Sequence, residues 1–210
     1  IDVCFVCLYP VAIVSFILDN IGKFKKGCII TDVCGIKGYV ADNVEIPLKE
    51  SGLSYIGGHP MAGKEKSGFI YSDSALLNGA SYILIETENT DKNSFKTVEN
   101  IITSLGCKII TATAKAHDKI IAYTSQLAHI VSSSYVKSPA IELEKGFTGG
   151  SFQDMTRVAS LSESMWKDLF LLNKENLLIE LDNIIENLKD YRKAIYENNE
   201  DGLLKLLKEG

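Results

Sequence analysis

Short apolar, β-branched runs alternate with longer segments of helical character through the first half of the chain, and this feature constrains the fold most. A strand buried on both faces of a sheet is apolar at nearly every position, as these runs are. An alternation of strand and helix predicts a parallel sheet with right-handed crossovers. The expected strands are 2–8, 27–32, 53–58, 80–86 and 107–113, and the expected helices between them are 11–22, 36–51 and 91–105.

The alternation stops near residue 113. From Ala114 onward apolar residues recur at helical spacing, and no run is typical of a strand. The predicted fold class is therefore α/β followed by all-α, with one domain over 1–113 and a helical domain over 114–210. The apolar stripes of the helical part are wide, which fits burial against a second copy in a homodimer and fits packing within one chain equally well.

Net charge limits the kinds of partner that this chain can bind, and hydropathy and cysteine content indicate its compartment. A formal net charge of −5 and the lack of a basic block argue against a nucleic acid or an anionic membrane surface. The longest apolar stretch, 3–18, is broken by Pro10, is too short to span a bilayer and lacks the basic start of a signal peptide. Five cysteines without paired spacing indicate a reducing compartment. We expect a cytoplasmic protein with a small-molecule ligand.

Three consecutive strand ends carry unusual residues. Ligands of open parallel sheets bind outside the carboxyl ends of the strands, where this chain places Tyr9 with Pro10, then 32–35, then His59. The glycines before His59 allow a tight turn, and the proline after it restricts its backbone to extended conformations. His59 is therefore a candidate for the ligand side, although a surface-loop histidine satisfied by water fits the same pattern.

The helical part offers two further candidates. Only two of the 22 basic Lys and Arg side chains are arginines, and Arg157 lies on a largely apolar helix. An arginine there suggests bidentate capture of a carboxylate, with an i,i+3 pair to Asp154 as the competing interpretation. His129 is either a second pocket residue or a histidine capped by a neighbouring carbonyl, and His117 is interpreted as structural. The motifs of metal sites, serine nucleophiles and phosphate loops are missing, so no metal is expected.

Four segments and one tryptophan, in this order, carry a resemblance to a known family. They are TDVCGIKG (31–38), GGHPMAGKEKSG (57–68), SQLAH (125–129), GGSFQDMTR (149–157) and Trp166. Together they resemble the prephenate dehydrogenase family over nearly the whole chain. The resemblance implies NAD(P)-dependent oxidative decarboxylation of prephenate to 4-hydroxyphenylpyruvate in tyrosine biosynthesis. It also implies a partial Rossmann-type parallel sheet followed by a helical dimerisation domain, and a homodimer.

The resemblance also assigns roles to single residues. His59 matches the catalytic histidine that takes the proton of the substrate hydroxyl. The residues implied to bind or shape the substrate pocket are Arg157, His129, Gly150, Glu65 and Trp166, with the tryptophan reaching the pocket from either subunit. NAD or NADP is expected against the strand ends, at Tyr9, Pro10, Asp32, Cys34 and Gly35.

Two departures from the family pattern bear on activity. Many relatives carry a serine that hydrogen-bonds the catalytic histidine, whereas this chain has no hydroxyl at that place beside Cys34 and Gly35, so water or another donor must orient His59. The glycine-rich turn that binds the pyrophosphate is expected upstream of Ile1, so we expect a truncated form that binds dinucleotide weakly.

Three other functions remain open from the sequence. An arogenate dehydrogenase would share nearly every residue. A non-catalytic dimerising fragment would share the fold without turnover. A β-hydroxyacid dehydrogenase needs a lysine and an asparagine four residues apart on the interdomain helix, and the only such spacing is Lys96 to Asn100, which precedes the helical part.

Overall fold

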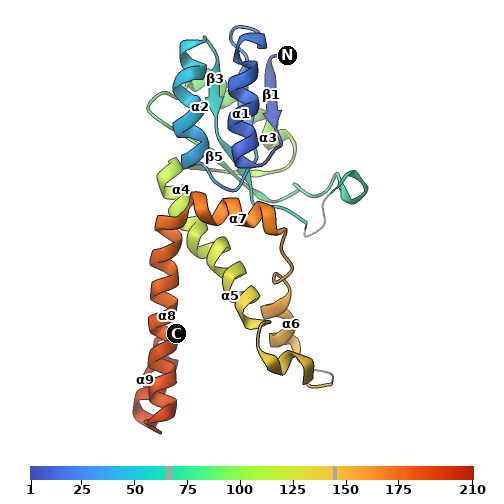
Figure 1. Cartoon of the computed structure of the whole chain (residues 1–210). Coiled ribbons are helices and arrows are strands. Elements are labelled where there is room, and N and C mark those ends of the chain that lie inside the picture. Colours follow the sequence, from blue (N-terminus) through green and yellow to red (C-terminus); the bar gives the residue numbers. More distant parts are fainter. Residues whose placement is uncertain (65–67, 144–145) are drawn as a thin grey trace.

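The computed structural model describes residues 1–64, 68–143 and 146–210, with an α/β layer first and helices that extend away from it (Figure 1). The strands are β1 (Val3–Val6), β2 (Ile29–Asp32), β3 (Ser54–Ile56), β4 (Gly58–Pro60), β5 (Ser81–Ile85) and β6 (Lys108–Ala112). The α-helices are α1 (Pro10–Asn20), α2 (Gly38–Glu50), α3 (Lys92–Ser104), α4 (Ala114–Ile121), α5 (Ala128–Tyr135), α6 (Gly150–Thr156), α7 (Glu163–Leu172), α8 (Lys174–Tyr196) and α9 (Glu200–Glu209). A π-helical turn, Ala122–Leu127, joins α4 to α5, and 3-10 turns occupy Ile21–Lys23, Phe69–Tyr71 and Pro139–Leu143. Within the described ranges, no helix is both long and apolar enough to cross a membrane.

The strands form two three-stranded sheets, ordered β1-β2-β3 and β4-β5-β6. All pairs in the first sheet and the β5–β6 pair are parallel, which confirms the predicted fold class of a parallel α/β layer followed by helices. The sequence did not predict β4, a separate strand that pairs antiparallel with β5 and places His59 opposite Ile83. A side chain at Gly58 would meet the Asp32 carbonyl oxygen at 2.7 Å and the Tyr82 hydroxyl at 2.8 Å, so only glycine allows β4 to start so close to β2.

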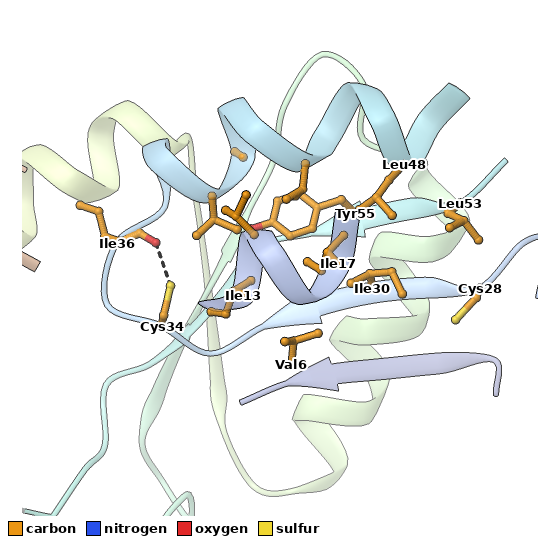
Figure 2. Close-up of a cluster of buried hydrophobic side chains, with 14 of the residues drawn as sticks. Val6, Ile13, Ile17, Cys28, Ile30, Cys34, Ile36, Leu48, Leu53 and Tyr55 are labelled. Carbon is orange, nitrogen blue, oxygen red and sulfur yellow. Dashed lines mark hydrogen bonds between the residues drawn. The ribbon is translucent and has the colours of Figure 1, made fainter. Parts of the chain in front are cut away.

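Two apolar cores cover the two faces of the α/β layer. Helices α1 and α2 bury Ile13, Ile17 and Val44 against Ile30 and its neighbours on one face (Figure 2). On the other face, α3 buries its apolar side chains against β3 and β5. Burial of one such side chain contributes about 1.5–3 kcal/mol, so each helix is held mainly by its apolar stripe.

The helix starts show which contacts are local and which are tertiary. Asp91 and Thr113 are ordinary N-caps, whose side chains accept hydrogen bonds from backbone N–H groups in the first turns of α3 and α4. Helix α2 has no such local cap. Its first N–H groups, on Lys37 and Gly38, donate instead to the carboxylate of Asp118 on α4, at 2.9 and 2.8 Å. The start of α2 is therefore tied to the helical part of the chain.

The helices after β6 form two arms and one element that returns to the sheet (Figure 1). Helix α7 returns, and its Leu169 packs into the core formed by α1 and α2. Helices α8 and α9 form one arm, in which the Tyr191 hydroxyl donates to the carbonyl of Leu206 at 3.1 Å. Helices α5 and α6 form the other, joined where the Ser132 hydroxyl donates to the Met155 carbonyl at 2.7 Å.

Candidate active site

A cavity of about 1130 Å³ lies where the carboxyl ends of β1 and β2 meet the helices. Ligand pockets commonly measure about 300–1,000 Å³, so this one has room for more than one small molecule. The α/β layer supplies Tyr9, Gly35 and His59 to its wall. The helical part supplies His129, Arg157 and Trp166. Residues from both halves of the chain therefore surround one space.

His59 is half-buried on β4, and its two ring nitrogens have different surroundings. Nδ1 lies 2.8 Å from Nε2 of His117. On the other side of the ring, a side chain at Gly35 would begin 3.6 Å from Nε2, so glycine keeps this nitrogen open to the cavity. Burial lowers the pKa of His59 to about 3, helped by the neighbouring ionisable groups His117 and Lys37 and opposed by Asp32. The imidazole is therefore neutral at neutral pH.

The orienting partner of His59 is His117, which sequence reasoning had treated as structural. His117 is buried at the start of α4, and its Nδ1 lies 2.7 Å from Oδ1 of Asp118. The group beside Nδ1 of His59 in this chain is thus an imidazole from the helical part. The adjacent His117–Asp118 pair was visible in the sequence, but its contact with His59 links positions 58 residues apart.

A buried ion pair fixes the strand ends beneath the cavity. Asp32 is fully buried and accepts hydrogen bonds from the Lys37 ammonium, the Cys34 backbone N–H and the Tyr55 hydroxyl. Lys37 also donates to the Gly58 carbonyl at 2.5 Å. Burial, followed by the negative charge of Asp32, raises the pKa of Tyr55 well above its usual value. Because Gly58 precedes His59, this pair holds the backbone that carries the imidazole.

The predicted cofactor residues divide into two groups. Tyr9 and Gly35 line the cavity, as expected of residues that contact a ligand. Pro10 is buried at the first position of α1, and Asp32 is occupied by its three donors. The Cys34 thiol donates to the Ile36 carbonyl at 3.0 Å within the core (Figure 2), and burial raises its pKa to about 12. These last three residues therefore support the strand ends and do not face the cavity.

The helical wall combines an aromatic pair with a cation. His129 stacks on Trp166 of the same chain, with ring centroids 3.9 Å apart. The Nδ1–H of His129 donates to the Ser125 carbonyl at 2.8 Å, so this ring is capped by a carbonyl and also lines the cavity. His129 therefore combines a carbonyl cap with a place on the cavity wall. Arg157, at the end of α6, lines the same wall.

Comparison with known proteins identifies the family. The prephenate dehydrogenase nucleotide-binding domain matches residues 1–111, and the prephenate dehydrogenase dimerization domain matches 113–209. The chain belongs to the prephenate dehydrogenase family. It is similar to the prephenate dehydrogenase of Bacillus subtilis, with 32% identity over 86% of this chain and 50% of that protein. It is also similar to the cyclohexadienyl dehydrogenase of Zymomonas mobilis, with 30% identity over 88% of this chain and 64% of that protein.

Solved members of the prephenate dehydrogenase family have the same fold. The prephenate dehydrogenase of Aquifex aeolicus, solved with hydroxyphenyl propionate and NAD+, has a TM-score of 0.88 and 29% identity over 99% of this chain and 73% of that one. The arogenate dehydrogenase of Synechocystis has a TM-score of 0.81 and 26% identity over 99% and 76%. The chain spans about half the length of the first prephenate dehydrogenases it matches by sequence, 50% and 57%.

Of the residues that the prephenate dehydrogenase resemblance implied, one lies off the cavity wall and one falls outside the part of the chain that the structure describes. Gly150 is the first residue of α6, outside the cavity wall. Glu65 lies outside the described residues. Lys64, which sequence reasoning did not single out, is a second cation on the wall and pairs with Asp73 at 3.1 Å. Its position inside the GGHPMAGKEKSG segment is the sequence feature that could have identified Lys64 as a site residue.

Among the described residues, no three His, Cys, Asp or Glu side chains are grouped as a metal site would require.

The structure also bears on the alternative of a β-hydroxyacid dehydrogenase. Lys96 and Asn100 are exposed on α3, where Lys96 pairs with Glu99 at 2.6 Å. Neither of them lines the cavity, so they cannot serve as its catalytic pair.

Proposed function

We propose that this chain carries the substrate site of an NAD- or NADP-dependent dehydrogenase that converts prephenate to 4-hydroxyphenylpyruvate and carbon dioxide. One observation carries the proposal: a neutral imidazole from the α/β layer, His59, and a guanidinium from the helices, Arg157, line the same cavity. Prephenate needs both groups, because it has a ring hydroxyl to deprotonate and carboxylates to bind. The organisation that we propose is a domain over 1–113, a helical domain over 114–210 and a cytoplasmic location.

His59 is suited to act as the general base. Oxidation at the ring carbon that bears the hydroxyl requires the hydroxyl proton to leave as hydride departs, and loss of carbon dioxide then makes the ring aromatic. A neutral imidazole with Nε2 toward the cavity accepts that proton through a hydrogen bond. General-base assistance of this kind contributes about 10²–10⁴-fold to the rate. The low pKa of His59 keeps it in the accepting form over a wide pH range.

Cations on the cavity wall offset the negative charge of the substrate. Arg157 offers the planar donor pair that binds a carboxylate in bidentate fashion. Lys64 provides a second positive charge on the same wall. The stacked pair of His129 and Trp166 gives a flat apolar surface that suits a six-membered ring. In this proposal the helical part, together with Lys64 of the α/β part, binds and orients the substrate, while His59 carries out the proton transfer.

The residues present fit the nicotinamide end of a dinucleotide. Gly35 at the end of β2 has no side chain over Nε2 of His59, which leaves space for a flat ring beside the reacting carbon. Tyr9, after β1, borders the same space. A bound nicotinamide would supply the hydride acceptor. The chain's own contribution is to hold the substrate between this space and His59.

A homodimer through the helical part belongs to the proposal. The matching family domain is described as a dimerization domain, and α8 carries exposed apolar side chains, among them Leu178, Ile179, Ile185 and Leu188. Several large apolar side chains exposed on one helix fit an interface with a second copy.

Arogenate is the second candidate substrate, and the Synechocystis neighbour named an arogenate dehydrogenase supports it. Arogenate has an amino group where prephenate has a keto group, so the ring chemistry and the role of His59 are the same. The cyclohexadienyl dehydrogenase relative supports the same class of six-membered dienyl acids.

Paired assays test the proposal. The complete gene product is supplied with prephenate or arogenate and with NAD+ or NADP+, and formation of the reduced nicotinamide is followed by absorbance. We expect turnover with at least one of the four combinations, with release of carbon dioxide in a one-to-one ratio. No turnover in all four, from folded protein, would favour the non-catalytic dimerising role.

A further inference from the structure

Asp118, His117 and His59 form a line of three hydrogen-bonding groups that runs from the start of α4 to the cavity. The two contacts are 2.7 Å, from Asp118 Oδ1 to His117 Nδ1, and 2.8 Å, from His117 Nε2 to His59 Nδ1. His117 is buried and Asp118 nearly so. The line therefore lies inside the protein, and only the last ring reaches the cavity.

The carboxylate of Asp118 sets the direction of these hydrogen bonds. It also accepts the backbone N–H groups of Lys37 and Gly38, at the positive end of α2. An ionised carboxylate can only accept, so the proton between it and the first ring belongs to His117 Nδ1. A neutral imidazole has one N–H, so His117 Nε2 accepts and His59 Nδ1 donates. The unprotonated nitrogen of His59 is then Nε2, on the side of Gly35.

We propose that Asp118 and His117 are positioning residues that hold His59 in the Nδ1–H tautomer and so present an unprotonated Nε2 to the cavity. Asp118 and His117 thereby orient the His59 ring, which in the family pattern is hydrogen-bonded by a serine hydroxyl that this chain lacks. The tautomer is a property of the folded chain alone. Its catalytic consequence deepens the proposed function and rests on it.

The opposite arrangement requires a protonated His117. An imidazolium at His117 would donate to His59 Nδ1 and leave the proton of His59 on Nε2, where it could not accept from a substrate. The groups facing this pair are Asp118 behind His117, and Lys37 and Asp32 near His59. Lys37 is already a buried cation, and the charge of Asp118 is already met by two N–H donors. The two arrangements differ in the position of the ring protons, so a measurement of the ring tautomers separates them.

Nitrogen NMR of the histidine rings tests the tautomer directly. The chain has three histidines, so a long-range ¹H–¹⁵N spectrum contains three ring patterns. The variant His129→Gln assigns one, and His117→Gln separates the other two. We expect both His59 and His117 to be neutral at pH 7 with the proton on Nδ1. A proton on Nε2 of His59, or a doubly protonated His117, would overturn the proposal. The tautomers are read from the unsubstituted chain, and the two variants serve only to assign its signals.

A matched pair of variants tests whether His117 causes the tautomer. The amide oxygen of His117→Gln can still accept from His59 Nδ1, whereas His117→Leu has no acceptor. We expect the Gln variant to keep the Nδ1–H pattern and the Leu variant to shift toward Nε2–H, the form that free histidine prefers. Backbone amide spectra confirm that each variant is folded. An unchanged ring pattern of His59 in a folded His117→Leu variant would contradict the proposal that His117 fixes the tautomer.

Turnover separates this proposal from the proposed function. In the complete gene product, His117→Leu should lower kcat about tenfold or more with little change in KM, as loss of a tautomer-fixing partner does elsewhere. His117→Gln should recover most of that loss. Equal kcat in the His117→Leu variant and the unsubstituted protein would contradict a positioning role of His117 in catalysis. If the expected tautomer is observed but no cyclohexadienyl acid is turned over, the proposed function is wrong. The proposal that Asp118 and His117 fix the tautomer of His59 then still holds.

Discussion

The two halves of the molecule treat their apolar side chains differently. In the α/β half, Ile13, Ile17 and Ile30 are fully buried between helices and sheet. In the arm formed by α8, only Leu177 and Ala194 are buried, although the helix has 23 residues. The first half buries these side chains within one chain, whereas α8 leaves apolar side chains exposed that a second copy would cover in the proposed dimer. The cavity lies between the two halves, so His59 of the α/β layer faces proposed binding groups on helices that we propose to be shared in a dimer.

The comparison predicts first that His59 governs turnover and not binding. His59→Asn removes the proton acceptor on the α/β side and should lower kcat about 10²–10⁴-fold. Affinity for hydroxyphenyl propionate, the ligand of the Aquifex neighbour, should change little, because the binding groups lie on the helices. Steady-state kinetics and calorimetric titration give the two quantities. Unchanged kcat would remove His59 from its proposed role.

Second, stability should depend on the buried ion pair of the α/β half. Lys37→Met leaves Asp32 as an unpaired buried charge and should reduce the free energy of unfolding by about 3–5 kcal/mol. The matched control is Lys189→Met on α8, where the pair with Glu186 is exposed to solvent and should contribute little to stability. Urea denaturation measures both. Equal losses in the two variants would contradict the distinction between a buried network and a solvated arm.

Third, the helical half should control affinity. Arg157→Ala removes charge-assisted hydrogen bonds to a carboxylate, which contribute about 1.5–3 kcal/mol. We therefore expect KM for prephenate to rise by about ten- to a hundredfold, with a smaller change in kcat. The other arginine of the chain, Arg192, is exposed on α8 and serves as the control. If Arg192→Ala raised KM as much, general electrostatic attraction would explain both effects.

Fourth, a charge on the apolar arm should weaken the dimer. Leu188 is 61% exposed on α8, and burying such a side chain is worth about 1.5–3 kcal/mol. Leu188→Glu should therefore favour the monomer in sedimentation analysis. Leu105→Glu is the matched control, because Leu105 is 51% exposed in the α/β half, away from the arm. A monomeric unsubstituted protein, or dissociation by both variants, would contradict an interface on α8.

The smallest expected effect is that of mild acid on catalysis. The pKa of His59 is lowered to about 3, so the base stays unprotonated when the pH falls from 7 to 5, and kcat/KM should not show an acid limb near pH 6.5. Stability should behave differently. Below about pH 6.5 the unfolded chain binds a proton at His59 that the folded chain does not, so stability falls by at most about 1.4 kcal/mol per pH unit. His59→Asn should flatten this slope. A kcat/KM limb at pH 6.5 would show that His59 is not held neutral.

The site was predicted unevenly, and the reason is physical. His59, Arg157 and His129 were singled out from local patterns and Trp166 from the family resemblance, and all four line the cavity. Residues with unusual chemistry and family motifs are visible without knowledge of the fold. His117 was assigned a structural role, since its partner is 58 residues away. Asp32 and Cys34 were expected at the cofactor because they end a strand. Side-chain direction at that strand end instead turns them into the core.

The order of residues alone determined the parallel α/β layer, the helical part that follows it and the family, because periodicity and motif spacing are written along the chain. Only the tertiary structure decided that β4 pairs antiparallel with β5, that Lys37 and Asp32 fix its start, and that Asp118 and His117 orient His59. Each of these depends on hydrogen-bond distances between segments that folding brings together. Such distances follow from how the layers pack, and no local pattern records them.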